Sequence, residues 1–458
     1  MRFVLVHGWG FHAGMFADFI AHLDGAEVTL VDLGFVSGGP KGATEWPEDA
    51  IAVGHSLGLL WLLENGGGRY KALVSVQGFD CFCCHIAPSR LAALNRGLER
   101  DPGGTLQAFW RSCGAAGFAW PEALNAARLD EGLDWLMHWD ARKAKDELNC
   151  PKLALASRDD LIVPVSMTEA IWGEQGVVWS PDGGHVLPLS HPRWCARHVL
   201  EFARTLRRSA AVAASFGARA ESYELHAGLQ RAVADHLAQY LPELKQPHVL
   251  ELGCGTGLFS RHLVSRYLDG SFVLTDVAPA MIAECRRNLA PAKTAHISYE
   301  VMDAGEAGGH AGLDLIVSSM TLHWLPDPVA SLKRLEKLLA PGGVLLYATL
   351  GLESFAEWRN VLAELGLPSG LAEIHQLPGV IEEERLFPDE SALAFLQRMK
   401  AVGGLTPQEG YSPLSPGALR RAIHAADAKF RGRITWHIVY GRLSAPEASA
   451  SSPSTKPA

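Results

Sequence analysis

The sequence has 458 residues, well above the ~150 residues typical of one domain, so two or three domains are expected. Hydrophobic residues make up 48% and charged residues 20%, which is typical of globular proteins and excludes a disordered chain. Asp and Glu outnumber Lys and Arg by 50 to 41, which disfavours nucleic acid as a partner. No apolar run reaches the ~18 residues that cross a bilayer, and residues 3–6 are too short for a signal peptide, so we expect no membrane partner and a cytoplasmic protein.

Two stretches of the chain share one pattern, in which short β-rich runs alternate with helical runs and a Gly-rich turn follows a strand. The first covers residues 1–206 and the second covers residues 215–443. Residues 207–214 are small and partly basic, and they could form a short helical linker or the tail of the preceding helix. Residues 444–458 are rich in Ser, Ala and Pro and carry too little apolar surface to fold, so we expect a disordered tail.

Short buried strands are expected in the first stretch at residues 3–6, 28–31, 51–53, 73–76, 153–156 and 177–179. Helical patterns between them favour an α/β fold with a parallel sheet covered on both faces. Residues 81–145 interrupt the alternation with helical segments rich in Leu, Ala and Trp. We expect a short helical lid over the carboxyl edge of the sheet.

The segment Val53-Gly54-His55-Ser56-Leu57-Gly58 ends a strand and opens a helix, which is the context that a G-x-S-x-G nucleophile turn requires. A serine hydroxyl is inert at neutral pH without a base and an orienting acid. His185 follows the last expected strand, and Asp160 follows the strand before it in a D-x-x-V-P pattern, with Asp159 as the adjacent alternative. The order Ser56, Asp160, His185 is that of the α/β-hydrolase fold and predicts a catalytic triad.

The segment His7-Gly8-Trp9-Gly10 directly follows the first strand and fits an oxyanion loop. The backbone amides of Trp9 and Leu57 would bind the oxyanion of the tetrahedral intermediate. The alternative is a G-x-S-x-G in an ordinary loop, but four elements in the required order favour a serine esterase. His55 and His191 are expected to be structural.

The expected lid contains a group of aromatic residues and a group of cysteines. The aromatic residues could line a channel for a long acyl chain or could only pack the lid against the sheet: Phe109, Trp110, Phe118, Trp120, Trp135 and Trp139. The segment Cys81-Phe82-Cys83-Cys84-His85 invites a metal interpretation, but no second Cys or His pair stands at zinc spacing. We expect reduced thiols on a partly buried segment and no metal ion.

A second Gly-rich loop stands in His248-Val249-Leu250-Glu251-Leu252-Gly253-Cys254-Gly255-Thr256-Gly257, after a strand and before a helix. Glycines allow a nucleotide-like ligand to approach the backbone closely. A dinucleotide site is the alternative, but the spacing is not G-x-G-x-x-G and an acid precedes the glycines. Asp276 ends the next strand and could accept both ribose hydroxyls, and Asp303 follows a third strand, where an adenine edge would lie. The expected cofactor contacts are therefore Glu251, Gly253, Gly255, Gly257, Asp276, Asp303 and Ala304.

With a fourth strand at residues 314–319 and the turn Pro341-Gly342-Gly343 before a fifth, these motifs resemble class I, Rossmann-like methyltransferases that use S-adenosylmethionine. More specific segments surround this core: residues 215–230, 318–324, 349–351, 354–355, 400–404 and 439–443. They resemble the malonyl-carrier-protein O-methyltransferases, and the resemblance covers essentially all of residues 215–443.

That family methylates the free carboxylate of a malonyl thioester, on acyl carrier protein or coenzyme A, at the start of biotin synthesis. An esterase later removes the methyl group from the pimeloyl ester, and residues 7–10 and 54–58 resemble that esterase. The resemblance implies a bifunctional enzyme with acyl carrier protein as its partner. The alternatives are a fusion that acts on other acids and esters, and a hydrolase half that serves only as a scaffold.

A malonyl carboxylate is already ionised at pH 7, so no general base is expected for methyl transfer. The candidate substrate contacts are Tyr223, His226 and Gln230, in a helical lid over the methyl acceptor, and Arg90, Arg96 and Arg100, which would dock the carrier protein. Ordinary helix packing is the alternative for the first three residues, and a solvated helix face is the alternative for the arginines.

Overall fold

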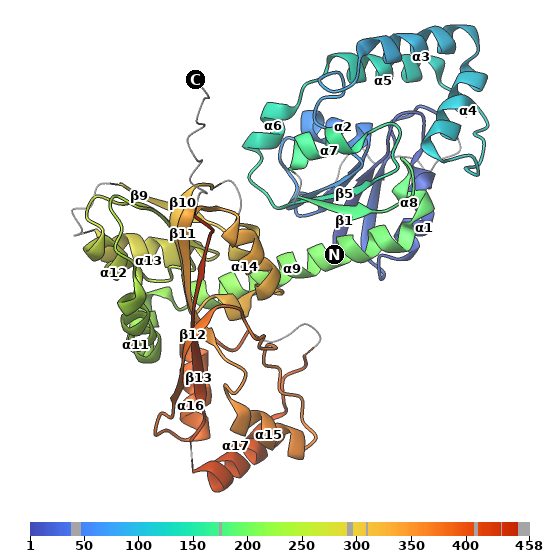
Figure 1. The fold of residues 1–458 in the computed structure, drawn as a ribbon. Helices are drawn as coiled ribbons and strands as arrows, with labels where there is room; N and C mark the ends of the chain where they lie inside the picture. Colours follow the sequence, from blue (N-terminus) through green and yellow to red (C-terminus); the bar gives the residue numbers. More distant parts are fainter. Residues whose placement is uncertain are drawn as a thin grey trace, which may run out of the picture. The chain divides into compact units, whose positions relative to one another are not determined.

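A computed structural model describes residues 1–37, 47–173, 176–290, 296–307, 310–406, 411–431 and 433–447. The chain divides into two compact units, Met1–Thr205 and Leu206–Ala458, and each is described here by itself (Figure 1). Within the described residues, no helix combines the length and the apolar character that crossing a membrane requires.

The first unit is built on a six-stranded sheet in which every neighbouring pair is parallel, in the order β2-β1-β3-β4-β5-β6. Its strands are β1 (Arg2–Val6), β2 (Glu27–Val31), β3 (Ile51–His55), β4 (Ala72–Val76), β5 (Lys152–Ser157) and β6 (Val177–Ser180). Every residue of β3 and β4 is buried, because helices cover both faces of the sheet. The six predicted strands and the parallel α/β fold are confirmed.

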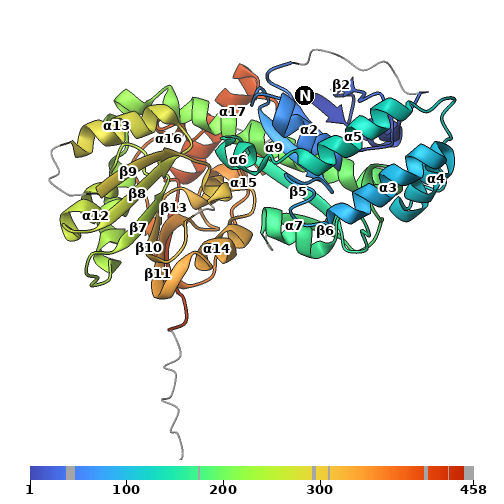
Figure 2. The same ribbon diagram turned by 90° about the horizontal axis from the view of Figure 1, so that it is seen from above.

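The helices of this unit before the insertion are η1 (Ala13–Phe16), α1 (Ala17–Ala21) and α2 (Leu57–Asn65). The predicted insertion between β4 and β5 consists of α3 (Pro88–Arg100), α4 (Pro102–Cys113), α5 (Ala126–His138) and α6 (Arg142–Glu147). The helices after β5 are α7 (Val165–Trp172), α8 (Leu187–Ser190) and the long α9 (Pro192–Gly217). Both ribbon views show α3, α4 and α5 gathered on one side of the unit (Figures 1 and 2).

The predicted linker at residues 207–214 is helical and belongs to α9. Of the two possibilities that the sequence left open, the tail of the preceding helix is the one that the structure adopts. Its small residues favour helix, and no glycine or proline interrupts it between Pro192 and Gly217.

The second unit contains a seven-stranded sheet in the order β12-β13-β11-β10-β7-β8-β9. Its strands are β7 (His248–Leu252), β8 (Ser271–Asp276), β9 (His296–Val301), β10 (Leu313–Ser319), β11 (Leu339–Leu350), β12 (Val380–Leu386) and β13 (Trp436–Ser444). Strands β7 to β11 pair in parallel, as predicted, whereas β13 lies antiparallel to both β11 and β12. We did not predict β12 or β13 as strands.

The helices of the second unit are η2 (Ala220–Ser222), α10 (Tyr223–His226), α11 (Gly228–Leu237), η3 (Ala238–Tyr240), α12 (Ser260–Arg266), α13 (Pro279–Leu289), η4 (Ala304–Glu306), η5 (Leu322–Trp324), α14 (Pro328–Glu336), α15 (Ala356–Glu364), α16 (Ala392–Ala401) and α17 (Pro416–Phe430). Successive strand residues point to opposite faces of the sheet. Val249 accordingly packs in one core with residues of α11, α12 and α13, and Leu250 packs in the other with residues of α14. Helices α15, α16 and α17 lie together beside β12 and β13 (Figure 1).

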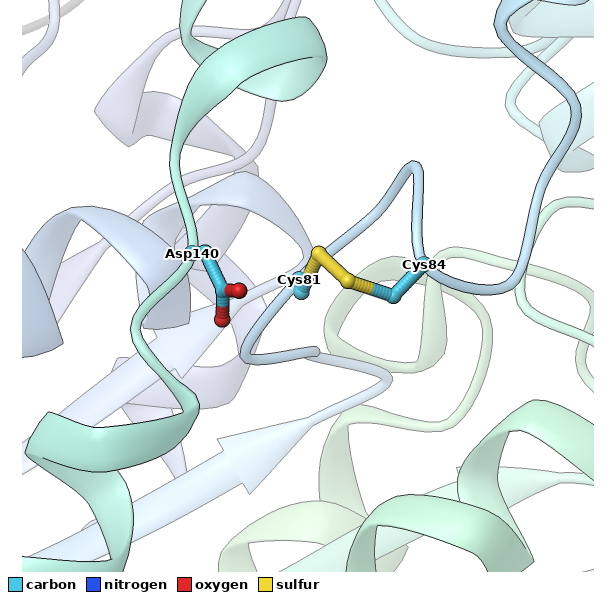
Figure 3. A group of neighbouring side chains, drawn as sticks. All are labelled: Cys81, Cys84 and Asp140. Carbon is cyan, nitrogen blue, oxygen red and sulfur yellow. A yellow bond between two sulfur atoms is a disulfide. The ribbon is translucent and has the colours of Figure 1, made fainter.

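The expectation of reduced thiols is wrong for two cysteines. Cys81 and Cys84 form a disulfide, because the turn between them brings their Cα atoms to 5.5 Å (Figure 3). Asp140 lies beside them, but both sulfur atoms are used in the disulfide, so this group offers no thiolate to a metal ion. Cys83, between them, is free.

The expectation of a disordered tail is wrong for residues 444–446. Ser444 is the last residue of β13. The amide of Ala445 donates to the carbonyl of Gly343 at 2.9 Å, and the amide of Gly342 donates to the carbonyl of Pro446 at 3.2 Å. The turn before β11 thus provides partners for the chain beyond residue 443. Residues 448–458 lie outside the described residues.

Candidate active sites

Ser56 stands at the sharp turn between β3 and α2, with φ 53°. Two glycines make this turn possible. A Cβ on Gly54 would lie 2.5 Å from the Cα of Leu59, and a Cβ on Gly58 would collide with the backbone of Val6 in β1. Any side chain at either position would push the helix away from the sheet, so the glycines hold the serine at its place.

The structure brings Ser56, His185 and Asp160 together from three separate loops at the carboxyl ends of the strands. The Nε2 atom of His185 lies 2.9 Å from the Oγ atom of Ser56, and its Nδ1 atom lies 2.8 Å from the Oδ2 atom of Asp160. All three side chains are buried. Hydrogen-bonded contacts from nucleophile to base and from base to acid are what proton transfer from the serine requires.

Asp160, and not Asp159, is the acid that contacts His185. The Oδ1 atom of Asp160 accepts hydrogen bonds from the amides of Ile162 and Val163 at 2.8 and 3.0 Å, which fixes the carboxylate. Asp159 instead accepts from the amide of Gly184 at 2.9 Å and from the hydroxyl of Ser157. Asp159 therefore supports the loop that carries the histidine.

Sequence reasoning missed Gln77, which follows β4 with φ 53°. Its Nε2 atom donates to the Oδ2 atom of Asp160 at 3.0 Å and to the carbonyl of Gly184, and its Oε1 atom accepts from the amide of Leu187 at 3.0 Å. Gln77 is a positioning residue that ties the acid to both sides of the His185 loop. Its one signal in the sequence is a polar residue directly after a buried strand.

The predicted oxyanion loop lies against the nucleophile. A Cβ on Gly8 would be 2.9 Å from the Cβ of Ser56, so only glycine allows this approach. The indole of Trp9 donates to the carbonyl of Leu129 at 2.7 Å, which anchors the loop to the lid helix α5. The oxyanion role of the Trp9 and Leu57 amides remains a prediction.

His55 and His191 contact other parts of the hydrolase loops. The Nε2 atom of His55 lies 2.7 Å from the carbonyl of His185, and complete burial lowers the pKa of His55 to about 3. A neutral His55 thus supports the backbone of the triad histidine. His191 pairs with Asp182 at 3.0 Å, on the other side of the same loop.

A cavity of about 660 Å³, here called the esterase cavity, opens over Ser56. The lid provides most of its apolar lining, which includes Phe82, Leu91, Leu94, Phe109 and Leu136. Of the six aromatic residues predicted for a channel, only Phe109 lines this cavity. The prediction is wrong for the other five: Trp110, Phe118 and Trp120 pack on one another, and Trp135 stacks on Trp139.

Of the three lid arginines, Arg90 lines the esterase cavity and is exposed. Arg96 and Arg100 are exposed on the same helix, α3, and do not line it. An i, i+4 pair shares one helix face, so these two arginines are neighbours, whereas Arg90 points in a different direction.

A second pocket, here called the glycine-loop pocket, lies at the carboxyl ends of β7, β8 and β10. It brings together most of the residues predicted for the second site: Tyr223, Gln230, Glu251, Gly253, Gly255, Asp276, Asp303 and Ala304. Two predicted residues do not line it. Gly257 faces α13, where a Cβ would lie 3.2 Å from the Sγ atom of Cys285, and His226 is exposed at the end of α10.

Buried carboxyl groups give the glycine-loop pocket its acidic character. Asp276 accepts hydrogen bonds from the amides of Gly255 and Ala278 at 2.9 and 2.8 Å, and burial raises its pKa to about 6. Burial also raises the pKa of Glu251 to about 8, although the hydroxyl of Ser260 donates to it at 2.6 Å. Both groups would be stabilised as carboxylates by a positively charged ligand.

The backbone at Gly255 borders open space in the glycine-loop pocket. Its φ is 53°, and a Cβ built on it would meet no atom within 4 Å. A side chain there would extend into the open space of the pocket instead of into the protein. The loop therefore leaves room for a ligand against its backbone.

Several residues of the glycine-loop pocket come from segments without a recognisable motif. The last turns of α9 contribute Arg208, Ser209 and Phe216, and the hydroxyl of Ser209 donates to Asp303. Met320, at φ 57°, and Trp324 follow β10. The sequence indicates only a linker at residues 207–214, because no glycine or acid there marks them as part of a site.

Comparison with known proteins shows a methyltransferase in the second half of the chain. The family model described as "Methyltransferase domain" matches residues 250–345. A "Malonyl-[acyl-carrier protein] O-methyltransferase" of Magnetococcus marinus is 35% identical over 250 residues, which cover 51% of this chain and 92% of that relative.

Two further relatives align with both units of the chain. Each is named "Biotin biosynthesis bifunctional protein BioHC". That of Saccharophagus degradans is 27% identical and the alignment covers 84% of this chain and 76% of the relative. That of Cellvibrio japonicus is 25% identical, with 78% of this chain and 79% of the relative covered.

The chain is therefore a bifunctional enzyme, an α/β-hydrolase esterase fused to a class I methyltransferase, as predicted. Its two units carry separate sites, and 92% of the length of the Magnetococcus relative aligns with 51% of this chain. By that similarity, the chain belongs to the malonyl-[acyl-carrier protein] O-methyltransferase family.

Proposed function

We propose that the second unit transfers a methyl group from S-adenosylmethionine to the free carboxylate of malonyl-[acyl-carrier protein]. We propose that the first unit hydrolyses the methyl ester of the pimeloyl carrier protein, giving pimeloyl-carrier protein and methanol. The observation that carries this proposal is a linked Ser56, His185 and Asp160 in one chain with a methyltransferase. Both BioHC relatives align across the same two parts.

Ester hydrolysis follows from the geometry of the first site. Ser56 attacks the ester carbonyl while His185 takes the hydroxyl proton, and Asp160 stabilises the positive imidazole. The Trp9 and Leu57 amides stabilise the oxyanion, each for about 2.7–4 kcal/mol. His185 then gives its proton to the departing methoxide, and methanol leaves. A water molecule activated by His185 cleaves the acyl-serine and restores the hydroxyl of Ser56.

Methyl transfer requires positioning more than proton transfer. When bound, S-adenosylmethionine supplies the methyl group on a positively charged sulfur atom. Asp276 would accept the ribose hydroxyls, and Asp303 with Ala304 would contact the adenine. The acidic lining of the glycine-loop pocket complements the positive charge. Tyr223 and Gln230 would exclude water from it, which leaves an ionised acceptor carboxylate free to attack in line.

Addition and removal of a methyl ester in one chain is productive if the two steps act on different acyl lengths. The ester would be made on a three-carbon acid and cleaved on a seven-carbon one. Between those steps it masks a charge that would be costly in the apolar sites of the elongating enzymes. The esterase cavity of about 660 Å³ has room for the longer chain.

We further propose that residues 1–206 and 215–443 act as the two catalytic domains. Residues 207–214, expected as a linker, continue α9 and add Arg208 and Ser209 to the glycine-loop pocket. Arg90, Arg96 and Arg100 are our candidates for contact with the acidic carrier protein, Arg90 nearest to the esterase cavity. His226 is retained only as a candidate for the edge of the methyl-acceptor site. The proposed location is the cytoplasm, because the reactions need carrier-bound acyl intermediates.

Two assays on the purified chain test the proposal. Incubation with malonyl-carrier protein and S-adenosylmethionine should give the methyl ester, and pimeloyl-carrier methyl ester should be hydrolysed. Expression in biotin auxotrophs that lack either activity should restore growth in both. A fluorophosphonate label on Ser56 tests the scaffold alternative directly, because a hydrolase half without an activated serine would stay unlabelled. Activity on other acids and esters only would contradict the proposed substrates.

A further inference from the structure

A second cavity in the methyltransferase unit, of about 620 Å³, lies among α15, α16 and α17. We call it the acceptor cavity. Trp324 lines both this cavity and the glycine-loop pocket, and His323 lines the acceptor cavity beside it. The two spaces therefore meet at η5. A methyl acceptor must reach the donor from an adjoining space, and the acceptor cavity adjoins it.

The charges lining these two spaces are opposite. The glycine-loop pocket carries Glu251, Asp276 and Asp303. The described lining of the acceptor cavity includes Arg359 and Lys400 but no Asp or Glu, although acidic residues outnumber basic ones in the chain by 50 to 41. The remainder is largely apolar, with Phe355, Trp358, Leu362, Leu396 and Met399 among the lining residues. Such a cavity fits a negatively charged ligand with an apolar body.

Arg359 is the more sheltered of the two cations, being half-buried on α15, whereas Lys400 is exposed. Its Nη1 atom donates to the carbonyl of Leu352 at 3.5 Å, a long contact. Burial lowers its pKa, and among the described residues no carboxylate contributes an opposing effect.

Three other cations of this unit are ion-paired. Arg385 binds Glu353, Arg398 binds Glu390, and Lys429 binds Glu364. An arginine that lines an apolar cavity without a carboxylate is a poor contributor to stability. It is well suited to a carboxylate brought by a ligand, because guanidinium and carboxylate match in a two-point hydrogen-bonded pair.

We propose that the acceptor cavity binds the acyl acceptor and that Arg359 binds its carboxylate, which makes Arg359 the residue that selects acidic acyl thioesters. This inference rests on the proposed methyl transfer to a malonyl thioester. Without a counter-charge, an ionised carboxylate would not enter so apolar a space. Methylation then removes the negative charge and with it the ion pair, so the ester product binds less tightly than the substrate and leaves.

The test compares binding of malonyl-coenzyme A with that of acetyl-coenzyme A, which lacks the carboxylate but has the same arm. Calorimetry is performed with S-adenosylhomocysteine present. The full-length chain should bind the malonyl thioester at least about tenfold more tightly. Arg359→Met should reduce this preference to about twofold or less, and Arg359→Lys should retain part of it. Lys429→Met removes a paired surface cation from the same region and should behave as the parent.

Kinetics and a second variant separate recognition from folding. Arg359→Met should raise KM for malonyl thioester about tenfold or more, with a smaller effect on kcat and unchanged affinity for S-adenosylhomocysteine. Leu396→Trp, which fills the acceptor cavity and keeps Arg359, should also raise KM. If Arg359→Met loses S-adenosylhomocysteine binding, Arg359→Lys and Leu396→Trp still decide the question.

Two results would overturn the inference: a malonyl preference that survives in Arg359→Met, or a parent protein without such a preference. Failure of the proposed function looks different. A parent chain that methylates no malonyl thioester, but still prefers the malonyl ligand in an Arg359-dependent manner, would refute the proposed substrate and leave the assignment of Arg359 intact.

Discussion

Single residues in both sites occupy conformations or environments that ordinary residues avoid. Ser56 and Gln77 both have φ 53°, and Asp276 and Glu251 are carboxyl groups buried in the protein. Backbone strain of this kind costs of order 1–3 kcal/mol per residue. The strain at Ser56 and Gln77 is tolerated because each makes hydrogen bonds that the surrounding loops could not otherwise make. The strained residues and the buried carboxyl groups are therefore the most informative to change.

Ser56→Ala should abolish ester hydrolysis, because no other hydroxyl is placed on the Nε2 atom of His185 within the described residues. The expected loss in kcat is about 10⁴-fold or more, and His185→Ala should be nearly as damaging, since the two residues act as a unit. Methyl transfer and S-adenosylmethionine binding should be unchanged in both variants. Hydrolysis near the parent rate in Ser56→Ala would remove this serine from the nucleophile role.

Gln77→Ala should lower kcat for hydrolysis by about 10- to 100-fold with little change in KM, because Asp160 and the His185 loop lose their common support. The pH profile is the diagnostic measurement. Loss of orientation of the Asp160 carboxylate should shift the pH dependence of kcat/KM for hydrolysis, which a general loss of stability would not do. Asn65→Ala, on the surface end of α2, serves as the control. An unchanged profile would make Gln77 merely structural.

Binding of S-adenosylmethionine should strengthen as pH rises. Burial raises the pKa of Asp276 to about 6, so the ligand-free group is largely protonated at pH 5 and ionised at pH 7. A cation and ribose hydroxyls prefer the ionised form, so binding releases a proton and the affinity should rise by up to about tenfold per pH unit below pH 6. Glu251, with a pKa of about 8, extends a weaker rise to higher pH.

Calorimetry between pH 5 and 9 measures this dependence. Asp276→Asn should bind more weakly at pH 7 and lose the steep part of the curve, whereas Asp314→Asn, at a half-buried position of β10 that does not line the pocket, should keep it. A parent affinity that is flat between pH 5 and 7 would contradict the assignment of Asp276.

At the scale of elements, the strands and their terminal loops could be predicted and the additions around them could not. Each triad residue lies in the loop that follows a predicted strand, and parallel strands place their carboxyl ends at one edge. Strand β12, with sequence Val-Ile-Glu-Glu-Glu-Arg-Leu, is an edge strand whose charged residues hide its periodicity. Strand β13 pairs with a strand far away in the sequence: Leu345 of β11 lies opposite Leu443, 98 positions later. Only the folded chain brings these two segments together.

The role of the lid aromatics could not be predicted from the sequence either. The aromatic residues could either line a channel or pack the lid, because aromatic side chains gain as much from contact with one another as from contact with a ligand. Trp110 illustrates this: it stacks on Phe11, and its indole donates to the carbonyl of Gly10 at 3.0 Å. Trp110 thus attaches the insertion to the oxyanion loop, whereas leucines such as Leu91, Leu94 and Leu136 line the esterase cavity. Composition alone could not distinguish these uses.

At the scale of the whole molecule, each unit holds a complete set of residues for its own reaction. The three triad residues lie within Met1–Thr205, and the glycine-loop pocket and the acceptor cavity are lined from Leu206 onwards. Changes in one site should therefore leave the other reaction intact. What the two reactions share is the ester, so their compatibility depends on the selectivity of the esterase cavity for acyl length.

The esterase should prefer pimeloyl methyl ester over malonyl methyl ester, because otherwise it would remove the methyl group as soon as it was added. Each buried methylene contributes about 0.8 kcal/mol, so four extra methylenes supply up to ~3 kcal/mol, or a preference of roughly a hundredfold in kcat/KM. Phe109→Ala removes an apolar ring that lines the cavity beside Trp9 and should reduce this preference several-fold. Trp120→Ala, a lid residue that is 45% exposed and outside the cavity, is the matched control. Equal kcat/KM for the two carrier-bound esters in the parent chain would refute selection by length and leave the fusion without this means of avoiding a futile cycle.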